Sequence, residues 1–261
     1  MTAEQLKNII DLVGLKMDYV PKAFDLFHLG WLLITVIGVL IVLKVYDKRY
    51  ISNYFTFATI VLAIGEVYKQ AVLSLQSGTF EYKWANLPLQ FAVVPIYTYL
   101  LSAILKRGKF YNCLCAYNGT FGLLAGTIAL IMPTPVFSNF MGLNVQAMLH
   151  YSILVIVGAL TLRTYVKTLT VSIFSIALAI FVFFVALSET LNAVVPIIFG
   201  QAIDLYFIGR YMQLGAPIFS HVKQAFPHYV FVIFYTLIII ELTIALTYAS
   251  YKLANKKKIY R

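Results

Sequence analysis

Charged residues are scarce in this chain, where Asp, Glu, Lys and Arg make up 11% of 261 residues and hydrophobic residues 61%. A soluble domain of this length carries about a quarter charged residues. The mean hydropathy is +0.86, and the apolar residues gather in runs of about 20, the length that crosses a bilayer as a helix. The scarcity of charge therefore excludes a soluble domain and predicts an all-α integral membrane protein.

Cysteine is nearly absent as well. Cys113 and Cys115 are the only two, and they lie in one apolar run without a neighbouring His or further Cys. Zinc sites and disulfide frameworks need more such residues, so we expect no metal and no cofactor, and two small buried thiols. The chain also lacks P-loop, HExxH and GxSxG patterns, which excludes an ATPase, a zinc protease or a serine hydrolase of those types.

Seven apolar segments are long enough to span the membrane, and we expect seven transmembrane helices at about 24–45, 51–73, 87–105, 110–132, 145–165, 171–195 and 229–251. Residues 24–251 then form one transmembrane domain, between an amphipathic segment at 1–23 and a basic tail at 252–261. The first 23 residues lack the basic start, apolar middle and small-residue exit of a signal peptide, so we expect them to be retained.

The net charge of +10 is concentrated between the spans and not along one basic face, which argues against nucleic acid as a partner. Thirteen of the 20 lysines and arginines follow the first, third, fifth and seventh segments. The side richer in Lys and Arg is normally cytoplasmic. The expected topology has the amino terminus outside and the carboxyl terminus in the cytoplasm, with membrane lipids as partners and the oligomeric state open.

Two segments outside the spans have features of their own. Leu6, Ile9, Ile10 and Val13 recur at helical spacing, which predicts an amphipathic N-terminal helix. Such a helix either lies on the outer membrane surface or packs on the bundle. The connection from 196 to 228 exceeds the usual loop length, so we expect it to have a functional role or a short helix of its own.

Polar side chains inside the spans are concentrated toward the outer face. Ionisable groups in hydrocarbon normally face the bundle interior or a water-filled cavity. One outward-facing polar cavity would accommodate nearly all of them, and we assign to it His28, Glu66, Gln90, Gln146, His150, Glu189, Asn192 and Glu241.

Several of these residues have more than one interpretation. Gln146 and His150 share a helix face at four apart, and His150 is the candidate general base because its imidazole exchanges protons near neutral pH. Glu66 is three residues from Lys69, so the two form either a structural ion pair or part of the site. Glu241 either lines the cavity or hydrogen-bonds a neighbouring helix, and His28 either lines it or sits in the interface.

The segment around Pro88 is the most distinctive. Proline suits the first turn of a helix, because the amide hydrogen it lacks has no acceptor there. We therefore expect Pro88 to open the third span, with Gln90 in its first turn as one wall of the cavity.

These residues resemble the YwaF-like bacterial integral membrane proteins, which are related to a eukaryotic transmembrane phospholipid acyltransferase. The resemblance covers about residues 24–251 and rests on Gly78, the stretch Leu87-Pro88-Leu89-Gln90-Phe91-Ala92, His28, Gln146, His150, and Glu241 after Pro227-His228-Tyr229. It implies a seven-helix fold and acyl transfer, in which the motif Cys is the nucleophile and the His of the fifth span its base. Ala92 stands in place of that Cys.

Two functions follow from these observations. The first is a lipid-modifying acyltransferase or ester hydrolase, with His150 as base, Gln90 or Asn192 as donors, and a hydroxyl from Ser188, Thr190 or Thr127 as the remaining nucleophile. The second is a non-catalytic protein that binds or transports a lipid or a small polar ligand, or a subunit of a larger membrane complex. Because Ala92 replaces the motif Cys, the sequence supports the first function less strongly and the second more strongly.

Overall fold

The computed structural model of the chain describes residues 2–210 and 217–256, and its regular elements over these ranges are helices. The α-helices are α1 (Ala3–Val13), α2 (Leu26–Val45), α3 (Ile51–Leu75), α4 (Val94–Leu105), α5 (Lys109–Tyr117), α6 (Leu123–Ile131), α7 (Met141–Tyr165), α8 (Val171–Phe199), α9 (Pro217–Ala225) and α10 (His228–Lys256). The shorter elements are the 3₁₀ turns η1 (Lys48–Tyr50), η2 (Trp84–Asn86), η4 (Thr134–Val136), η5 (Val166–Thr168) and η6 (Leu205–Phe207), and the π-helical turn η3 (Asn118–Gly122).

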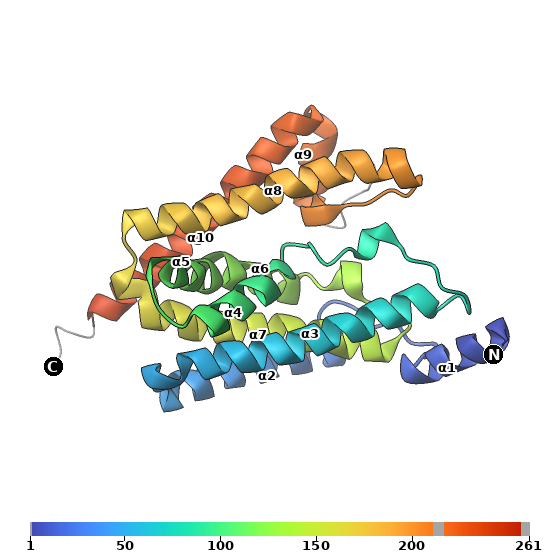
Figure 1. Cartoon of the computed structure of the whole chain (residues 1–261), viewed down its shortest axis with the longest axis horizontal. Coiled ribbons are helices and arrows are strands. Elements are labelled where there is room, and N and C mark those ends of the chain that lie inside the picture. The colour runs from blue at the N-terminus through green and yellow to red at the C-terminus, as the bar shows by residue number, and fades with distance from the viewer. Residues whose placement is uncertain (1, 211–216, 257–261) are drawn as a thin grey trace.

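Six helices in the described part of the chain are long and apolar enough to cross a membrane, so the prediction of a multi-pass all-α membrane protein is confirmed. They are α2, α3, the α5–η3–α6 unit, α7, α8 and α10. These helices run along the longest axis of the molecule (Figure 1). The expected third span at 87–105 is different, because α4 has 12 residues and is only about 18 Å long.

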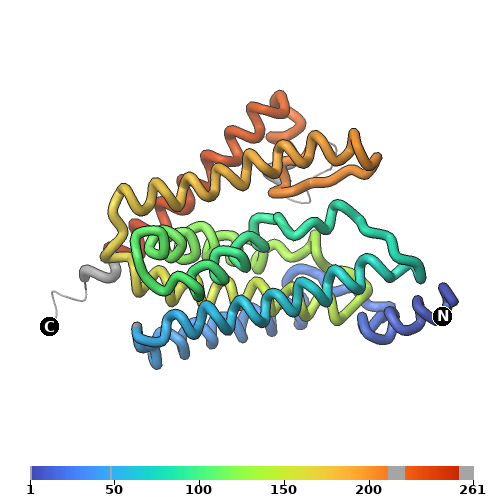
Figure 2. Tube along the Cα trace, in the orientation of Figure 1, coloured from blue at the N-terminus to red at the C-terminus, as the bar shows by residue number. Residues whose placement is uncertain are grey.

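The predicted opening of the third span at Pro88 is wrong, since the helix begins at Val94. The reason is the second proline, Pro95. In a helix that started near Pro88, Pro95 would lie in the interior, where its ring and missing N–H disrupt the ladder. In the observed helix Pro95 lies in the first turn, where proline is tolerated. Residues Leu87–Val93 are left as turns (Figure 2), and we call them the unwound segment.

Helix α7 is central in the bundle and contacts α2, α3, α5, α6 and α10. The contact with α6 is close because glycines face it. A Cβ atom added to Gly126 of α6 would lie 2.6 Å from the Cβ atom of Leu154 in α7, and one added to Gly158 of α7 would lie 2.9 Å from that of Leu123 in α6. Small residues at such contacts let two membrane helices pack backbone to backbone.

The N-terminal helix α1 is present, and it begins with a capping box in which Thr2 and Gln5 each bond the other's backbone N–H. Ile10 of this helix is buried with Val72, Phe140 and Leu143. On its other side Ile9, Leu12 and Val13 are exposed. The helix therefore packs on the end of the bundle and also presents an apolar face outward.

The two ends of the bundle differ in charge. The connections between α2 and α3, α4 and α5, and α7 and α8 lie at the end where α10 finishes, whereas α1 lies at the opposite end (Figure 2). These connections include Arg49, Lys106, Arg107 and Lys167. Of the predicted basic tail, residues 257–261 lie outside the described residues. The long connection after α8 includes the short helix α9, as predicted, and its residues 211–216 also lie outside them.

The close α6–α7 contact can be tested by its effect on the free energy of unfolding. We expect Gly126→Ala to lower the free energy of unfolding by about 1–3 kcal/mol, because the added methyl group overlaps Leu154 in a packed contact. The matched control is Gly30→Ala in α2, where an added Cβ meets nothing within 4 Å. Thermal unfolding in detergent measures both, and equal stability of the two variants would contradict the packing described.

Candidate functional site

The unwound segment is the centre of the candidate site. Its backbone carbonyls have no helical partners, and polar side chains of other elements bond them. The imidazole Nε2 of His150 in α7 lies 2.8 Å from the carbonyl oxygen of Ala92. The hydroxyl of Tyr97 donates to the carbonyl of Pro88 at 2.8 Å. Just before the segment, Gln70 of α3 donates to the carbonyl of Asn86 at 2.6 Å. Backbone at membrane depth is tolerated only with such partners.

His150 has a defined tautomer in this arrangement. A carbonyl oxygen can only accept, so Nε2 carries the hydrogen that it donates to Ala92, and Nδ1 is the lone-pair nitrogen of the neutral ring. The side chain is 4% exposed. The His150 ring thus meets a main-chain oxygen at Ala92.

Within the described residues, the candidate nucleophiles form no hydrogen bond with His150. Thr127 and Thr190 donate to carbonyls of their own helices at 2.8 and 2.9 Å, and Ser188 is buried without a hydrogen bond to any described group. Cys113 and Cys115 are buried thiols, as predicted. Cys115 packs near Tyr165, which is 15 residues after His150 and so about 22 Å along α7.

Three polar side chains of α3 lie next to this histidine. Oε1 of Glu66 accepts from the ammonium of Lys69 at 2.8 Å and from the amide of Gln70 at 2.7 Å. Glu66 is 8% exposed. The charges of Glu66 and Lys69 both act on the His150 ring, and Glu66 also acts electrostatically on Tyr82, Tyr97 and Tyr151. The predicted ion pair is present and belongs to a larger polar cluster.

Gln146 completes this cluster from α7. A Cβ atom added to Gly65, the neighbour of Glu66, would lie 3.2 Å from the amide nitrogen of Gln146. Glu66, Gln146 and His150 thus lie in one region of the bundle, together with Lys69, Gln70 and the Ala92 carbonyl. We call these six groups the α3–α7 site.

Two oxygen atoms of the α3–α7 site are buried and have no hydrogen-bond partner in the described part of the chain, namely Oε2 of Glu66 and Oε1 of Gln70. Both are acceptors, and each belongs to a group whose other atom is already bonded. Buried polar atoms are normally hydrogen-bonded, so orphans of this kind mark a place for a further molecule or water.

Gln90 and Asn192 form a second group, which holds a buried loop. Residues Ile203 to Ile208, with 0–1% exposure at 203, 205, 206 and 208, lie between α8, α10 and the unwound segment. Asn192 accepts from the Leu205 N–H at 2.8 Å and donates to the Leu205 carbonyl at 3.1 Å. Gln90 accepts from the Tyr206 N–H at 3.0 Å and donates to the Asp204 carbonyl at 3.2 Å. We call Gln90 and Asn192 the loop clamp.

The loop clamp holds strained backbone. Tyr206 and Phe207 have φ values of 59° and 60°, a left-handed conformation that costs about 1–2 kcal/mol for a residue with a side chain. The side-chain amides of Gln90 and Asn192 each use their oxygen and their nitrogen to hold this loop. We therefore do not count them among the groups available to a ligand.

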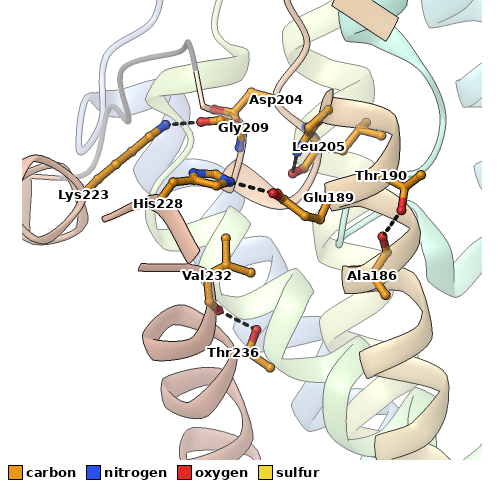
Figure 3. A network of polar contacts seen from close by, with 11 residues as sticks. Ala186, Glu189, Thr190, Asp204, Leu205, Gly209, Lys223, His228, Val232 and Thr236 are labelled. Atoms are coloured by element: carbon orange, nitrogen blue, oxygen red, sulfur yellow. Dashed lines mark hydrogen bonds and ion pairs between the residues drawn. The ribbon is translucent and has the colours of Figure 1, made fainter. Parts of the chain in front are cut away.

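Charged groups surround the same loop on its α10 side (Figure 3). Nε2 of His228 lies 2.7 Å from Oε1 of Glu189, and Lys223 donates to the carbonyl of Gly209. Asp204 accepts from the Gly209 N–H at 2.6 Å. Burial raises the pKa of the Asp204 carboxyl, while that hydrogen bond and the charge of Lys223 oppose the rise. Glu189 thus links α8 to α10 through its contact with His228.

The remaining two predicted residues lie apart from both groups. His28 is fully buried, accepts from the Phe24 N–H at 2.7 Å and bonds the Leu130 carbonyl at 2.7 Å, which ties the start of α2 to the end of α6. The expectation that Glu241 faces the interior is wrong, because it is exposed on the outside of α10. The eight predicted residues therefore do not line one cavity.

Some members of the two groups were missed by sequence reasoning. Gln70 carried a usable signal, because it lies four residues after Glu66 on the same helix face. Asp204 and Tyr206 of the buried loop carried none, since a loop gives no periodicity from which a buried position can be inferred. Comparison with family models, with curated proteins and with solved structures finds no match to this chain.

The loop clamp leads to a prediction about stability. We expect Asn192→Leu to lower the free energy of unfolding by about 2 kcal/mol, because it leaves the N–H and carbonyl of Leu205 buried without partners. Thr190→Ala in the same helix is the control, since its exposed hydroxyl bonds only the Ala186 carbonyl. Unfolding in detergent would show the difference, and an Asn192→Leu protein as stable as the control would rule out the clamp.

Proposed function

We propose that this polytopic membrane protein binds a small polar ligand at the α3–α7 site, and that binding or transport, not catalysis, is its activity. The observation that carries the proposal is the pair of orphan acceptors, Oε2 of Glu66 and Oε1 of Gln70, near the unwound segment that precedes the short helix α4. Unusually short apolar helices next to irregular backbone are typical of the ligand sites of transporters. The ligand that fits two free acceptors carries hydrogen-bond donors, such as an ammonium group.

Acyl transfer, which the YwaF-like resemblance implies, is the competing function. It is supported by the place of His150 beside Ala92. It is weakened by the contact itself, because the described residues bring the His150 ring to a carbonyl and bring no thiol or hydroxyl into hydrogen-bond contact with it. A base without a nucleophile cannot form the acyl-enzyme that the family mechanism requires.

The orientation that we propose has the α1 end outside the cell and the basic end in the cytoplasm of a bacterial plasma membrane. It is supported by the position of the basic connections at one end of the bundle (Figure 2). In this orientation the unwound segment, which precedes α4 on the α1 side of the bundle, lies toward the outside of the cell.

Ligand binding is tested by thermal stability in the presence of small solutes. We expect ammonium, ethanolamine or glycine to raise the melting temperature of the wild-type protein, with acetate as the solute that lacks donors. Glu66→Gln removes the carboxylate, and we expect it to weaken the binding about tenfold or more, since a hydrogen bond to a charged group is lost. Thr56→Ala, an exposed change in the same helix, is the matched control.

The competing function, acyl transfer, is tested by an acyl-release assay with purified protein in lipid. Product that forms with the wild type and disappears in His150→Ala would replace the binding proposal with catalysis. Equal background in the two proteins, together with a Glu66-dependent shift in melting temperature, is the result that we expect.

The orientation is tested with introduced thiols. The two native cysteines are buried, with 0% and 1% exposure, so an added surface cysteine is labelled selectively. We expect a membrane-impermeant maleimide to label Ser77→Cys at the α1 end on intact cells, and to label Lys167→Cys at the basic end only after the cells are opened. The reverse pattern would overturn the orientation.

A further inference from the structure

Glu241 is a carboxylic acid on the outer face of a membrane-spanning helix. It lies 13 residues after His228 and 11 before Lys252 in the apolar span of α10, so it is about 16–20 Å of helix from either end of that span. The inward face of α10 consists of Phe231, Tyr235, Ile239 and Thr243, all buried. Glu241 is two residues from Ile239 and therefore points about 200° away from that face.

This position leaves the carboxyl group without a partner among the residues that the structure describes. None of them hydrogen-bonds or pairs with Glu241. Ionisable groups within membrane spans face the bundle interior or pair with other groups, because an unpaired one in hydrocarbon is costly. A second molecule in the membrane can supply that partner.

The face around Glu241 has the form of a helix–helix contact. Exposed residues recur there at spacings of three and four, through Phe234, Leu237, Glu241, Ile244 and Tyr248. A sustained three-and-four spacing keeps one seam facing a parallel partner helix. Ala245 and Ala249 are also exposed on this side, four residues apart, and small residues at that spacing let a second helix approach closely. We call these seven residues the α10 seam.

We propose that the occupant of the α10 seam is a second copy of this chain, in a parallel dimer in which the two Glu241 carboxyl groups hydrogen-bond each other. All copies insert with the same orientation, so a two-fold axis along the membrane normal places every residue at the depth of its counterpart. A carboxyl pair that shares a proton is self-complementary, because each group can accept and one can donate. A second copy thus supplies the missing partner at the required depth, and the seam residues pack against themselves.

The test is self-association of the full chain in lipid bilayers, measured by energy transfer between labelled copies as the lipid-to-protein ratio is raised. We expect the wild type to dimerise and Glu241→Leu to weaken the dimer about tenfold, as for loss of an interhelical hydrogen bond in lipid. Glu241→Gln is expected to retain most of the association, because an amide also donates and accepts. Ala245→Leu should weaken it by preventing close approach.

Controls separate the seam from general effects on folding. Leu33→Ala removes an exposed apolar side chain from α2, away from the seam, and should leave the dimer unchanged. Leu237→Cys in the seam should form a disulfide between two copies, whereas Leu33→Cys should not. A wild type that is monomeric at every ratio, a Glu241→Leu protein that associates as strongly as the wild type, or Glu241 paired instead with a basic helix of a different co-purified protein would each overturn the proposal.

Discussion

The main constraint on this structure is that main-chain N–H and C=O groups within a membrane must find partners in the protein. The bundle contains two non-helical stretches away from water, the unwound segment and the buried loop around Leu205. Each has backbone groups bonded by side chains of other elements: His150 and Tyr97 bond the first, and Asn192 and Gln90 bond the second. Gln90 belongs to the first stretch and binds the second, so the two irregular segments stabilise each other.

This constraint divides the polar residues of the spans into those that hold the fold and those that remain available. The first kind includes Asn192, Gln90 and His28, whose side chains hydrogen-bond to backbone atoms. Glu66 and Gln70 each keep one buried oxygen unpaired. A polar residue inside a membrane span is therefore not by itself a ligand-binding residue, and the unpaired atoms distinguish the two kinds.

The sequence was sufficient for the features that depend on composition and periodicity. Long apolar runs predicted the membrane helices, whereas the depth of the polar residues predicted one shared cavity, and the described residues form separate groups instead. The start of α4 could not be predicted in the same way, because Pro88 and Pro95 both fit a first turn and only the tertiary contacts of the unwound segment select the later one. Glu241 was assigned to the wrong face since α10 is apolar on all sides, and such a helix has no periodicity that separates its buried face from its exposed one.

The π-helical turn η3 has a consequence for which changes of length this fold can accept. One extra residue in the turn shifts the helical phase of everything after it, so that α5 packs mainly on α8 while α6 packs on α7. A chain that lost a single residue from this turn would rotate α6 by about 100° and carry Gly126 off the α7 contact. Insertions and deletions at 118–122 are therefore coupled to the glycines of α6 and α7, so a variant of this chain with a different length here would need other residues at those contacts.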